Sequence, residues 1–348
     1  MPFRKIQDAD IKGKNILVRV DFNVKLERDD IREKYKMFAA RDTILFLQKN
    51  GARTISLLTH LGRPEGKRDE SVSLFKITDD IERVLGIQTV FLNDCIGEAV
   101  EAAVENAEGG EVFLLENVRF HAGEEENDEA FAEALAKPFD VFVNDAFSVC
   151  HRAHASIVSV TKHLPSYPGI YLEKEVDALS IVRSDVESPS TAIVGGAKIM
   201  TKLPLIEEFS KHFDTILVGG KIANEAMDED IPLPENVILP EDFEGDRLDI
   251  GERTRKLFLE KLEGRKTIVW NGPMGVFEDK RYAKGTVEIA KAVAASEAFS
   301  IVGGGESVEA LEELSLIDKV GFVSTGGGAM LAFLTGENMP GLEALEKE

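Results

Sequence analysis

Cysteines and long apolar runs are scarce in this sequence, and each shortage excludes a class of protein. The only cysteines among the 348 residues are Cys95 and Cys150, too few for a disulfide framework or for a zinc site built from cysteines alone. No uninterrupted apolar run approaches the roughly 18 residues of a membrane-spanning helix, and the opening residues MPFRKIQDADIKGK lack the apolar core of a signal peptide. We therefore expect a cytoplasmic protein.

Positive charge is also in short supply. The chain has 41 Lys and Arg residues against 63 Asp and Glu, for a formal net charge of −22. This balance argues against broad binding to nucleic acid, because such binding requires a basic face. Apolar residues make up 43% of the sequence, which is enough for a packed core and too many for a disordered chain. At roughly 150 residues per domain, the length predicts two domains.

Short apolar runs alternate with helix-like segments along the whole chain, which predicts an α/β fold. Apolar residues recur at helical spacing over 41–50 and 128–137, for example. Buried strands separated by helices are typical of a parallel sheet with helices on both faces. The predicted strands begin at Ile16, Arg53, Thr89, Glu111 and Asp140 in the first half, and at Thr191, Thr215, Thr267, Phe299 and Val320 in the second. Turn residues followed by a helix between His163 and Leu179 mark the expected boundary.

The first half places basic and polar side chains directly after its predicted strands. Ligands of an open parallel sheet bind outside the carboxyl ends of the strands. The candidate site residues are therefore Asp21, Asn23, His60, Arg63, Arg119, His121, His151, Arg152 and His154. Cations gathered there in an acidic protein indicate an anionic small molecule. The alternative is that each one is a surface cation or a structural histidine. A metal site at His151 and His154 is disfavoured by the neighbouring arginine.

Most predicted strands of the second half end in two or three glycines and then enter a helix. Helix N-termini carry unpaired N–H groups and a partial positive charge, and glycine lets a phosphate approach them, so the repeated junction favours a nucleotide polyphosphate. The P-loop and dinucleotide-binding signatures are both absent. Lys198 and Lys202 follow the glycines of AIVGGAKIMTK and would place two ammonium groups on the first helical turn. A solvated helix face is the alternative interpretation of this pair.

Eight motifs in a fixed order give the chain a resemblance to the phosphoglycerate kinases. They are VRVDFNV, THLGRP, LLENVRFHAGEEEND, FVNDAF followed by HRAHAS, AIVGGAKIMTKL, VWNGPMGVFE, IVGGGES and VSTGGGAML, and the resemblance extends from about Ile16 to Gly341. It implies two Rossmann-like lobes, each a parallel sheet with helices on both faces. The phosphoglycerate-binding lobe would span 1–165, an interdomain helix 166–185 and the nucleotide-binding lobe 186–336, while 337–348 would complete the first lobe.

The resemblance also implies the reaction and its residues. Phosphoryl transfer from 1,3-bisphosphoglycerate to ADP would give 3-phosphoglycerate and ATP, with Mg²⁺ as cofactor and with hinge closure bringing the ligands together. The residues implied for the acid are Asp21, Phe22, Asn23, Lys36, His60, Leu61, Gly62, Arg63, Arg119 and Arg152. Those implied for the nucleotide are Lys202, Glu278, Gly304, Gly305, Glu306 and Ser307, with Glu306 at the metal. The implied catalytic residues are Lys36, Lys198 and Lys202. No nucleophilic side chain is required, because phosphoryl transfer depends on positioning and charge neutralisation.

The sequence departs from the family pattern at several places. An ungapped count puts Lys36 where the family has an arginine, although Arg32 is nearby, and Glu306 stands where an aspartate is usual. The segment DEDIPLPENVILPEDFEGDRLDIGERT is shorter than its family counterpart and lacks a helix, while Lys221 replaces a common glycine. We expect a monomer, with self-association as the alternative if a second copy covers the flank left by the missing helix.

Two other functions remain open at this point. A ligand-binding or regulatory paralogue on the same scaffold could keep its ligands and lose turnover. A nicotinamide dehydrogenase would need the dinucleotide fingerprint and an acidic residue about 20 positions beyond it, and neither is evident in the sequence.

Overall fold

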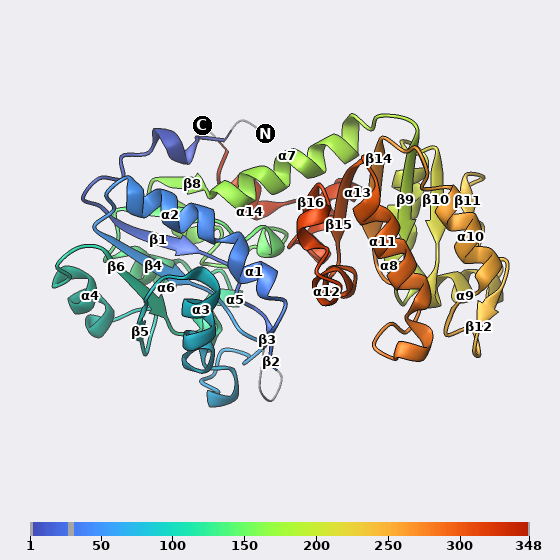
Figure 1. The fold of residues 1–348 in the computed structure, drawn as a ribbon. Helices are drawn as coiled ribbons and strands as arrows, with labels where there is room; N and C mark the ends of the chain where they lie inside the picture. Colours follow the sequence, from blue (N-terminus) through green and yellow to red (C-terminus); the bar gives the residue numbers. More distant parts are fainter. Residues whose placement is uncertain (1–2, 27–30, 347–348) are drawn as a thin grey trace. The chain divides into compact units, whose positions relative to one another are not determined.

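The computed structural model describes residues 3–26 and 31–346, and the chain forms two compact units. The N-terminal unit comprises Met1–Lys174 and Asn338–Glu348, and the C-terminal unit comprises Glu175–Glu337 (Figure 1). Each unit contains a six-stranded sheet whose strands are all parallel. The predicted α/β class is confirmed. Within the described residues, no helix combines the length and apolarity needed to cross a membrane.

The sheet of the N-terminal unit has the strand order β5-β6-β4-β1-β7-β8. Its strands are β1 (Asn15–Arg19), β4 (Thr54–Leu58), β5 (Val90–Leu92), β6 (Glu111–Leu115), β7 (Val141–Asn144) and β8 (Ser166–Pro168). All five strands predicted for the first half are present. The sixth, β8, was predicted as the start of the interdomain helix. Its proline lies in a three-residue edge strand paired with β7, where a missing N–H is tolerated, so helix α7 (Ile170–Ser184) begins four residues later than predicted.

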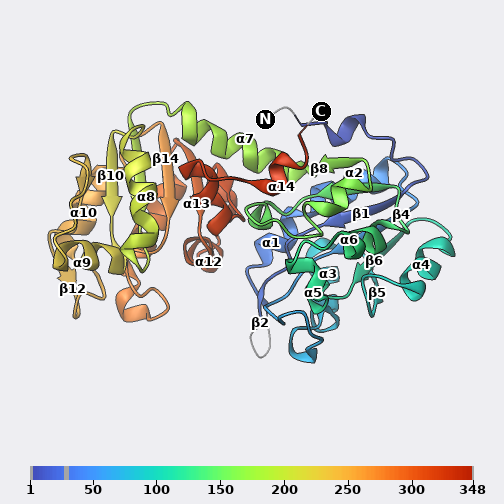
Figure 2. The same cartoon turned by 180° about the vertical axis from the view of Figure 1, so that it is seen from behind.

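Helices cover both faces of this sheet because successive strand residues point to opposite sides. Ile16 and Val18 of β1 join a core cluster with α1 (Lys34–Ala39), α2 (Arg41–Lys49) and α3 (Thr78–Leu85). Leu17 joins a second cluster with α4 (Glu98–Glu105) and α6 (Glu129–Ala136) (Figures 1 and 2). The remaining elements are α5 (Ala122–Glu125), α14 (Pro340–Glu343), and the antiparallel pair β2 (Lys25–Leu26) and β3 (Ile31–Arg32).

The sheet of the C-terminal unit has the order β11-β10-β9-β14-β15-β16. Its strands are β9 (Ser190–Val194), β10 (Thr215–Val218), β11 (Val237–Ile238), β14 (Thr267–Asn271), β15 (Phe299–Gly303) and β16 (Phe322–Val323). The helices are α8 (Ile199–Ser210), α9 (Gly220–Asp228), α10 (Glu252–Glu260), α11 (Lys284–Ala295), α12 (Gly305–Glu313) and α13 (Gly328–Thr335). They form two groups: α8 contacts α9 and α13, and α11 contacts α10 and α12.

Short 3₁₀-helices occupy several connections in both units. They are η1 (Ile6–Asp8), η2 (Glu70–Val72), η3 (Leu74–Ile77), η4 (Val118–Phe120), η5 (Phe147–Val149), η6 (Ser159–Lys162), η7 (Lys280–Tyr282) and η8 (Ile317–Lys319).

The shortened segment between α9 and α10 contains no helix. It forms β11 and the antiparallel pair β12 (Phe243–Glu244) and β13 (Asp249–Ile250). Arg255 of α10 is 2% exposed and donates to the Ile250 carbonyl at 2.7 Å. The same guanidinium lies 2.7 Å from Glu244 and 3.4 Å from Glu288 of α11. A buried arginine therefore fastens the short segment to two helices, because its five donors can serve several acceptors at once.

A fully buried carboxyl group begins the C-terminal unit. Glu175 of α7 accepts hydrogen bonds from the hydroxyls of Ser324 (2.7 Å) and Thr325 (2.8 Å) and from the Gly326 amide (3.1 Å). Burial outweighs these hydrogen bonds and raises the pKa of Glu175 to about 7. The carboxyl group is therefore half protonated near neutral pH.

We predict that Glu175 makes the protein less stable as pH rises from about 4.5 to about 7. In this window the unfolded chain has released the proton and the folded chain still binds it, so the free energy of unfolding falls with pH, by up to about 3 kcal/mol. Denaturant unfolding at several pH values measures the slope. Glu175→Gln, which cannot ionise, should flatten it, with Glu173→Gln on the same helix as the control. Equal slopes for the parent chain and Glu175→Gln would contradict the assignment.

Candidate functional site

Hydrogen bonds tie together the loops that follow three strands of the N-terminal unit. The side-chain oxygen of Asn23, after β1, accepts from the Gly62 amide at 2.9 Å. The carbonyl of Gly62, after β4, accepts from Arg119 at 3.0 Å. The Asn23 carbonyl accepts from the Lys36 ammonium at 3.1 Å. The structure thus brings together four of the residues predicted from the sequence, as expected for one edge of a parallel sheet.

Arg19, the last residue of β1, is a site residue that the sequence analysis missed. Its side chain is fully buried and donates to Ser156 Oγ at 3.0 Å, and a second nitrogen lies 3.2 Å from Nδ1 of His60. A guanidinium can only donate, so Nδ1 of His60 accepts and Nε2 carries the ring proton. Burial and the charges of Arg19 and Arg119 hold the pKa of His60 well below 6.5. His60 is therefore a neutral hydrogen-bond donor rather than a cation.

Glu124 of α5 supplies the buried negative charge that balances Arg19. Its two oxygens accept from the Ser156 hydroxyl (2.7 Å) and amide (2.8 Å), so Ser156 bridges the carboxylate and the guanidinium. Burial opposes ionisation, but interactions with His154, Arg19 and Ser156 lower the pKa of Glu124 overall. A charged residue within the apolar run ILVRV was the available sequence signal for this network, because a buried charge requires a partner.

Arg119 of η4 is balanced by Glu125, the residue that follows Glu124 in α5. Its guanidinium is 6% exposed and lies 3.2 Å from the carboxylate of Glu125, which is 44% exposed. Arg152 lies close enough for its charge to lower the pKa of Arg119, after the larger effects of burial and Arg19. Arg63 and Arg152 are themselves exposed. Of the three predicted arginines, two are therefore exposed and one, Arg119, is buried.

The other predicted residues differ in how they can contribute. A carboxylate oxygen of Asp21 accepts from the Ser148 hydroxyl at 2.5 Å, and the other accepts from the Asn23 amide at 3.0 Å. Phe22 and Leu61 were predicted to bind the ligand, but their side chains are buried in the core beneath the loops. Their contribution is to position backbone atoms, because an enclosed apolar side chain has no surface left for an anion.

Lys36 fits the position of the family arginine better than Arg32 does. Lys36 lies in α1, 3.1 Å from Glu33, and its charge acts on His60. Arg32 belongs to strand β3. The two residues are therefore in different elements and not one helical turn apart, because Glu33 between them adopts the left-handed conformation (φ 65°) and begins the helix.

In the C-terminal unit, Lys202 of α8 hydrogen-bonds the side-chain oxygen of Asn271 at the end of β14. Burial lowers the pKa of Lys202 to about 8, opposed by the charge of Glu306. Lys198 does not share the first turn of the helix with it, contrary to the prediction. It is the N-cap residue, with φ 67°, and it is exposed. The glycine-rich loop before α8 therefore ends at Lys198, which lies just outside the helix, whereas Lys202 lies within it.

The glycines of this unit serve packing as well as access. A Cβ on Gly195, after β9, would lie 2.1 Å from the Pro273 carbonyl, and one on Gly272 would lie 2.2 Å from the Gly195 carbonyl. These two loops therefore touch backbone to backbone. Ser307 is buried and its hydroxyl accepts from the Gly272 amide at 2.7 Å, so it positions this loop. Gly304 precedes α12, whose first residues Gly305 and Glu306 lie at the surface of the unit.

A cavity of about 420 Å³ lies at the carboxyl ends of these strands. Its lining includes Gly196, Gly220, Lys221, Arg247, Glu278 and Glu306. A larger cavity, of about 880 Å³, has Glu187, Lys266 and Phe299 in its lining. These residues lie at the amino ends of strands, where ligands of parallel sheets do not usually bind.

Arg247, which the sequence analysis missed, is held by Asp228 (2.6 Å) and Asn224 (3.1 Å). It belongs to the shortened segment, where no motif marked it.

Comparisons with known proteins agree on one family. The family model described as phosphoglycerate kinase matches residues 6–231 and 234–337. The chain is similar to the phosphoglycerate kinases of Moorella thermoacetica (40% identity over 389 aligned positions, 99% of each chain) and Borrelia hermsii (37% over 393 positions, 100% of each). The solved phosphoglycerate kinase of Pyrococcus horikoshii matches with a TM-score of 0.88 at 30% identity, covering 98% of each chain. The alignments exceed the 348 residues of this chain, and the family match breaks at 232–233, within the shortened segment.

We predict that the Lys202 amine becomes reactive at unusually low pH. With a pKa of about 8, against 10.5 for an ordinary lysine, it should be acylated by an amine reagent with a midpoint near pH 8. Lys256 is the matched control. It is exposed, and its hydrogen bond to Glu252 raises its pKa above 10.5. Mass spectrometry of labelled peptides across pH gives both midpoints. Lys202 labelling that follows the Lys256 curve would contradict the assignment.

Proposed function

The chain belongs to the phosphoglycerate kinase family and is a phosphotransferase, and from this premise we propose how its residues serve the reaction. The transfer moves the acyl phosphate of 1,3-bisphosphoglycerate to ADP and gives 3-phosphoglycerate and ATP. The observation that supports this assignment best is the match of almost the whole chain to one family. Each unit adds a cluster of cations at the carboxyl ends of its sheet.

We propose that the N-terminal unit binds the phosphoglycerate. Arg63, Arg119 and Arg152 would bind its phosphate and carboxylate, since guanidinium groups form parallel hydrogen bonds to such anions. His60 would donate a neutral hydrogen bond through Nε2. Asp21 would accept a hydrogen bond from the hydroxyl of the acid. Asn23 and Gly62 would position the loops, an assignment supported by the hydrogen bond between them.

We propose that the C-terminal unit binds the nucleotide in the cavity lined by Glu278, Lys221 and Glu306. Glu278 would bind the ribose hydroxyls, because a carboxylate accepts from two donors. The N-terminus of α12, at the half-buried Gly304 and Gly305, would bind phosphate oxygens. Lys198, exposed at the start of α8, would bind an outer phosphate. Ser307 would act indirectly, through its hydrogen bond to Gly272.

Glu306 fits the role of metal ligand for a nucleotide-bound Mg²⁺. Its carboxylate is exposed at the beginning of α12, close enough to Lys202 for the two charges to interact. Magnesium is usually held by one or two carboxylates together with substrate phosphates, which suits a site with a single carboxylate. The ion would neutralise phosphate charge during transfer. The extra methylene of Glu306 lengthens its reach relative to aspartate.

Catalysis is proposed to be electrostatic. Lys36 and Lys202 would stabilise the negative charge that spreads over the transferring phosphoryl group, which needs positioning rather than a covalent intermediate. Lys202 is suited to this because its hydrogen-bond partner, Asn271, is neutral, so that only the nearby charge of Glu306 offsets the positive charge. The alternative of a regulatory paralogue without turnover has no support, since both sets of anion-binding residues are retained.

Each unit carries every residue proposed for its own ligand, so a monomer suffices for activity. We propose that this monomer acts in the cytoplasm, where the family serves glycolysis. Self-association through the shortened segment is not required by the assignment.

We predict that the purified chain turns over 3-phosphoglycerate, ATP and Mg²⁺ at about 1–100 per second. Arg152→Ala should weaken 3-phosphoglycerate binding ten- to hundred-fold and leave ADP binding unchanged, because the charge-assisted contact contributes roughly 1.5–3 kcal/mol. A coupled assay and calorimetry measure the two effects. The control is Arg83→Ala, which removes an arginine exposed on α3 and paired with Asp80. Loss of ADP affinity with retention of the acid would overturn the division of labour, and binding without turnover would support the paralogue.

We further predict that Lys36→Arg raises kcat and Lys36→Ala lowers it strongly, while nucleotide affinity changes little. An arginine would hold the phosphoryl group through two parallel donors, and each 1.36 kcal/mol recovered in the transition state gives about tenfold in rate. Steady-state kinetics of both variants and of Arg32→Ala provide the test. If Arg32→Ala is the damaging change and both Lys36 variants are silent, the assignment of Lys36 is wrong.

A further inference from the structure

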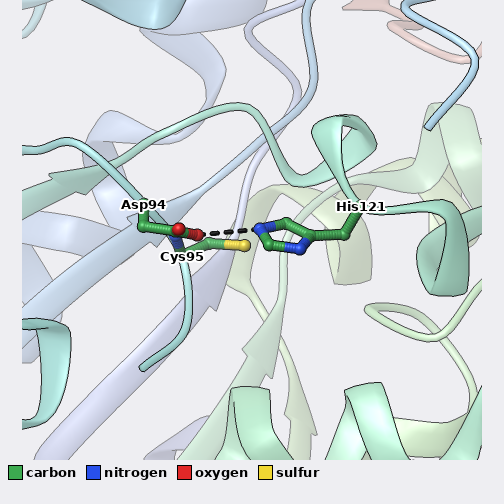
Figure 3. A group of neighbouring side chains, drawn as sticks. All are labelled: Asp94, Cys95 and His121. Carbon is green, nitrogen blue, oxygen red and sulfur yellow. Dashed lines mark hydrogen bonds and ion pairs between the residues drawn. The ribbon is translucent and has the colours of Figure 1, made fainter. Parts of the chain in front are cut away.

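Three potential metal ligands of the N-terminal unit meet outside the proposed substrate site. They are Asp94 and Cys95, which follow β5, and His121, which follows η4 after the neighbouring strand β6. One ligand atom from each lies within 4.8 Å of the other two. Nε2 of His121 is 2.7 Å from Oδ1 of Asp94 (Figure 3). None of the three has a role in the proposed phosphoryl transfer.

We propose that Asp94, Cys95 and His121 bind a divalent transition-metal ion of the zinc class, distinct from the Mg²⁺ of the nucleotide. The set offers one sulfur, one nitrogen and one oxygen. Zinc and similar borderline ions accept all three donor types, whereas magnesium and calcium bind almost only oxygen. The chemistry of the donors therefore selects the class of ion.

The directions of the side chains favour metal binding over a catalytic relay. In a cysteine–histidine–aspartate relay, the two ring nitrogens face different partners. Here the sulfur of Cys95 and the carboxylate of Asp94 both lie on the Nε2 side of the ring, with Nδ1 turned away (Figure 3). Three ligand atoms on one side of the ring, all within 4.8 Å of one another, suit a single ion.

The site is held in place before any ion binds. The ring of His121 stacks on Phe131, with centroids 5.1 Å apart and planes 28° apart. Oδ1 of Asp94 also accepts from the amide of Cys95 at 2.7 Å, which fixes the turn after β5. Cys95 is 1% exposed and belongs to the core cluster with α4 and α6. On binding, the ion would replace the proton of the Cys95 thiol and the proton shared by His121 and Asp94, while the fixed turn and ring limit further rearrangement, which favours affinity.

An entry path and an open coordination position are both available. The side chains of Asp94 and His121 are 47% and 27% exposed, so an ion can approach from solvent and keep a water molecule as its fourth ligand. Bound metal would join the loop after β5 to the segment that carries Arg119, two residues before His121. The ion would thus restrain the proposed acid-binding arginine, although the metal site itself does not depend on the proposed function.

Titration of the chelator-treated full chain with Co²⁺ tests the proposal. We expect one equivalent to bind in the presence of excess Mg²⁺, with a thiolate-to-cobalt charge-transfer band and the visible bands of a four-coordinate ion, and with displacement by Zn²⁺. Cys95→Ser should abolish the charge-transfer band. His121→Gln and Asp94→Asn, which change partly exposed groups, should weaken binding at least tenfold. Cys150→Ser is the control for the second buried thiol, and His212→Gln is the control for a histidine paired with a carboxylate elsewhere.

The absence of a charge-transfer band in the parent chain would overturn the proposal, and so would a band that persists in Cys95→Ser. Loss of the band in Cys150→Ser with retention in Cys95→Ser would place the metal elsewhere and also refute it. If Cys95→Ser does not fold, as judged by circular dichroism, unchanged affinity in both His121→Gln and Asp94→Asn is the refuting result. These spectra do not involve turnover, so the proposed kinase reaction and the metal site can fail independently.

Discussion

The proposed acid-binding edge of the N-terminal unit depends on one fully buried cation, the guanidinium of Arg19 at the end of β1. Burying an unpaired charge costs several kcal/mol, so the side chain of Arg19 needs both a hydrogen-bond acceptor and an opposite charge. Ser156 and Glu124 provide the acceptor and the opposite charge. His60 accepts from it through Nδ1 and is thereby fixed in the tautomer that presents a donor at Nε2. The position and protonation of one proposed ligand-binding group therefore follow from how a neighbouring buried charge is compensated.

In the C-terminal unit, the proposed anion site depends instead on contacts between backbone segments. The loops after β9 and β14 approach so closely that glycine is required where they touch, at Gly195 and Gly272. This contact fixes Asn271, which in turn holds the ammonium of Lys202. Lys202 is partly desolvated without a carboxylate bonded to it, and this is the reason that its pKa is lowered to about 8. A desolvated cation interacts strongly with phosphate for the same reason.

The elements that could be predicted from the sequence are those in which the local pattern and the burial agree. All ten predicted strands are present, because continuous apolar runs suit strands covered on both faces. Strand β8 was missed because its three residues include a proline and no apolar run. Lys198 was placed on a helix that begins one residue later. Arg19 and Arg247 were missed because their roles come from partners distant in sequence, such as Ser156 and Asp228. The sequence could not show which glycines allow close packing of loops and which allow a phosphate to approach, because that depends on where the facing loops lie.

Two adjacent carboxylates of α5 have opposite relations to solvent, and this has a consequence for selectivity. Glu124 is sealed in the interior, while Glu125 reaches Arg119 from the surface. An incoming anion can therefore displace Glu125 but not Glu124. If an anion binds at Arg119 as proposed, it exchanges with the carboxylate of Glu125, and only the difference between the two interactions appears as affinity. Small monovalent anions, which offer little more than the resident carboxylate, gain almost nothing from the exchange, whereas a ligand that adds further charges and hydrogen bonds gains from each of them. The Glu125 carboxylate thus competes with anions from solution, and only an anion that interacts more strongly with the site than Glu125 does will replace it.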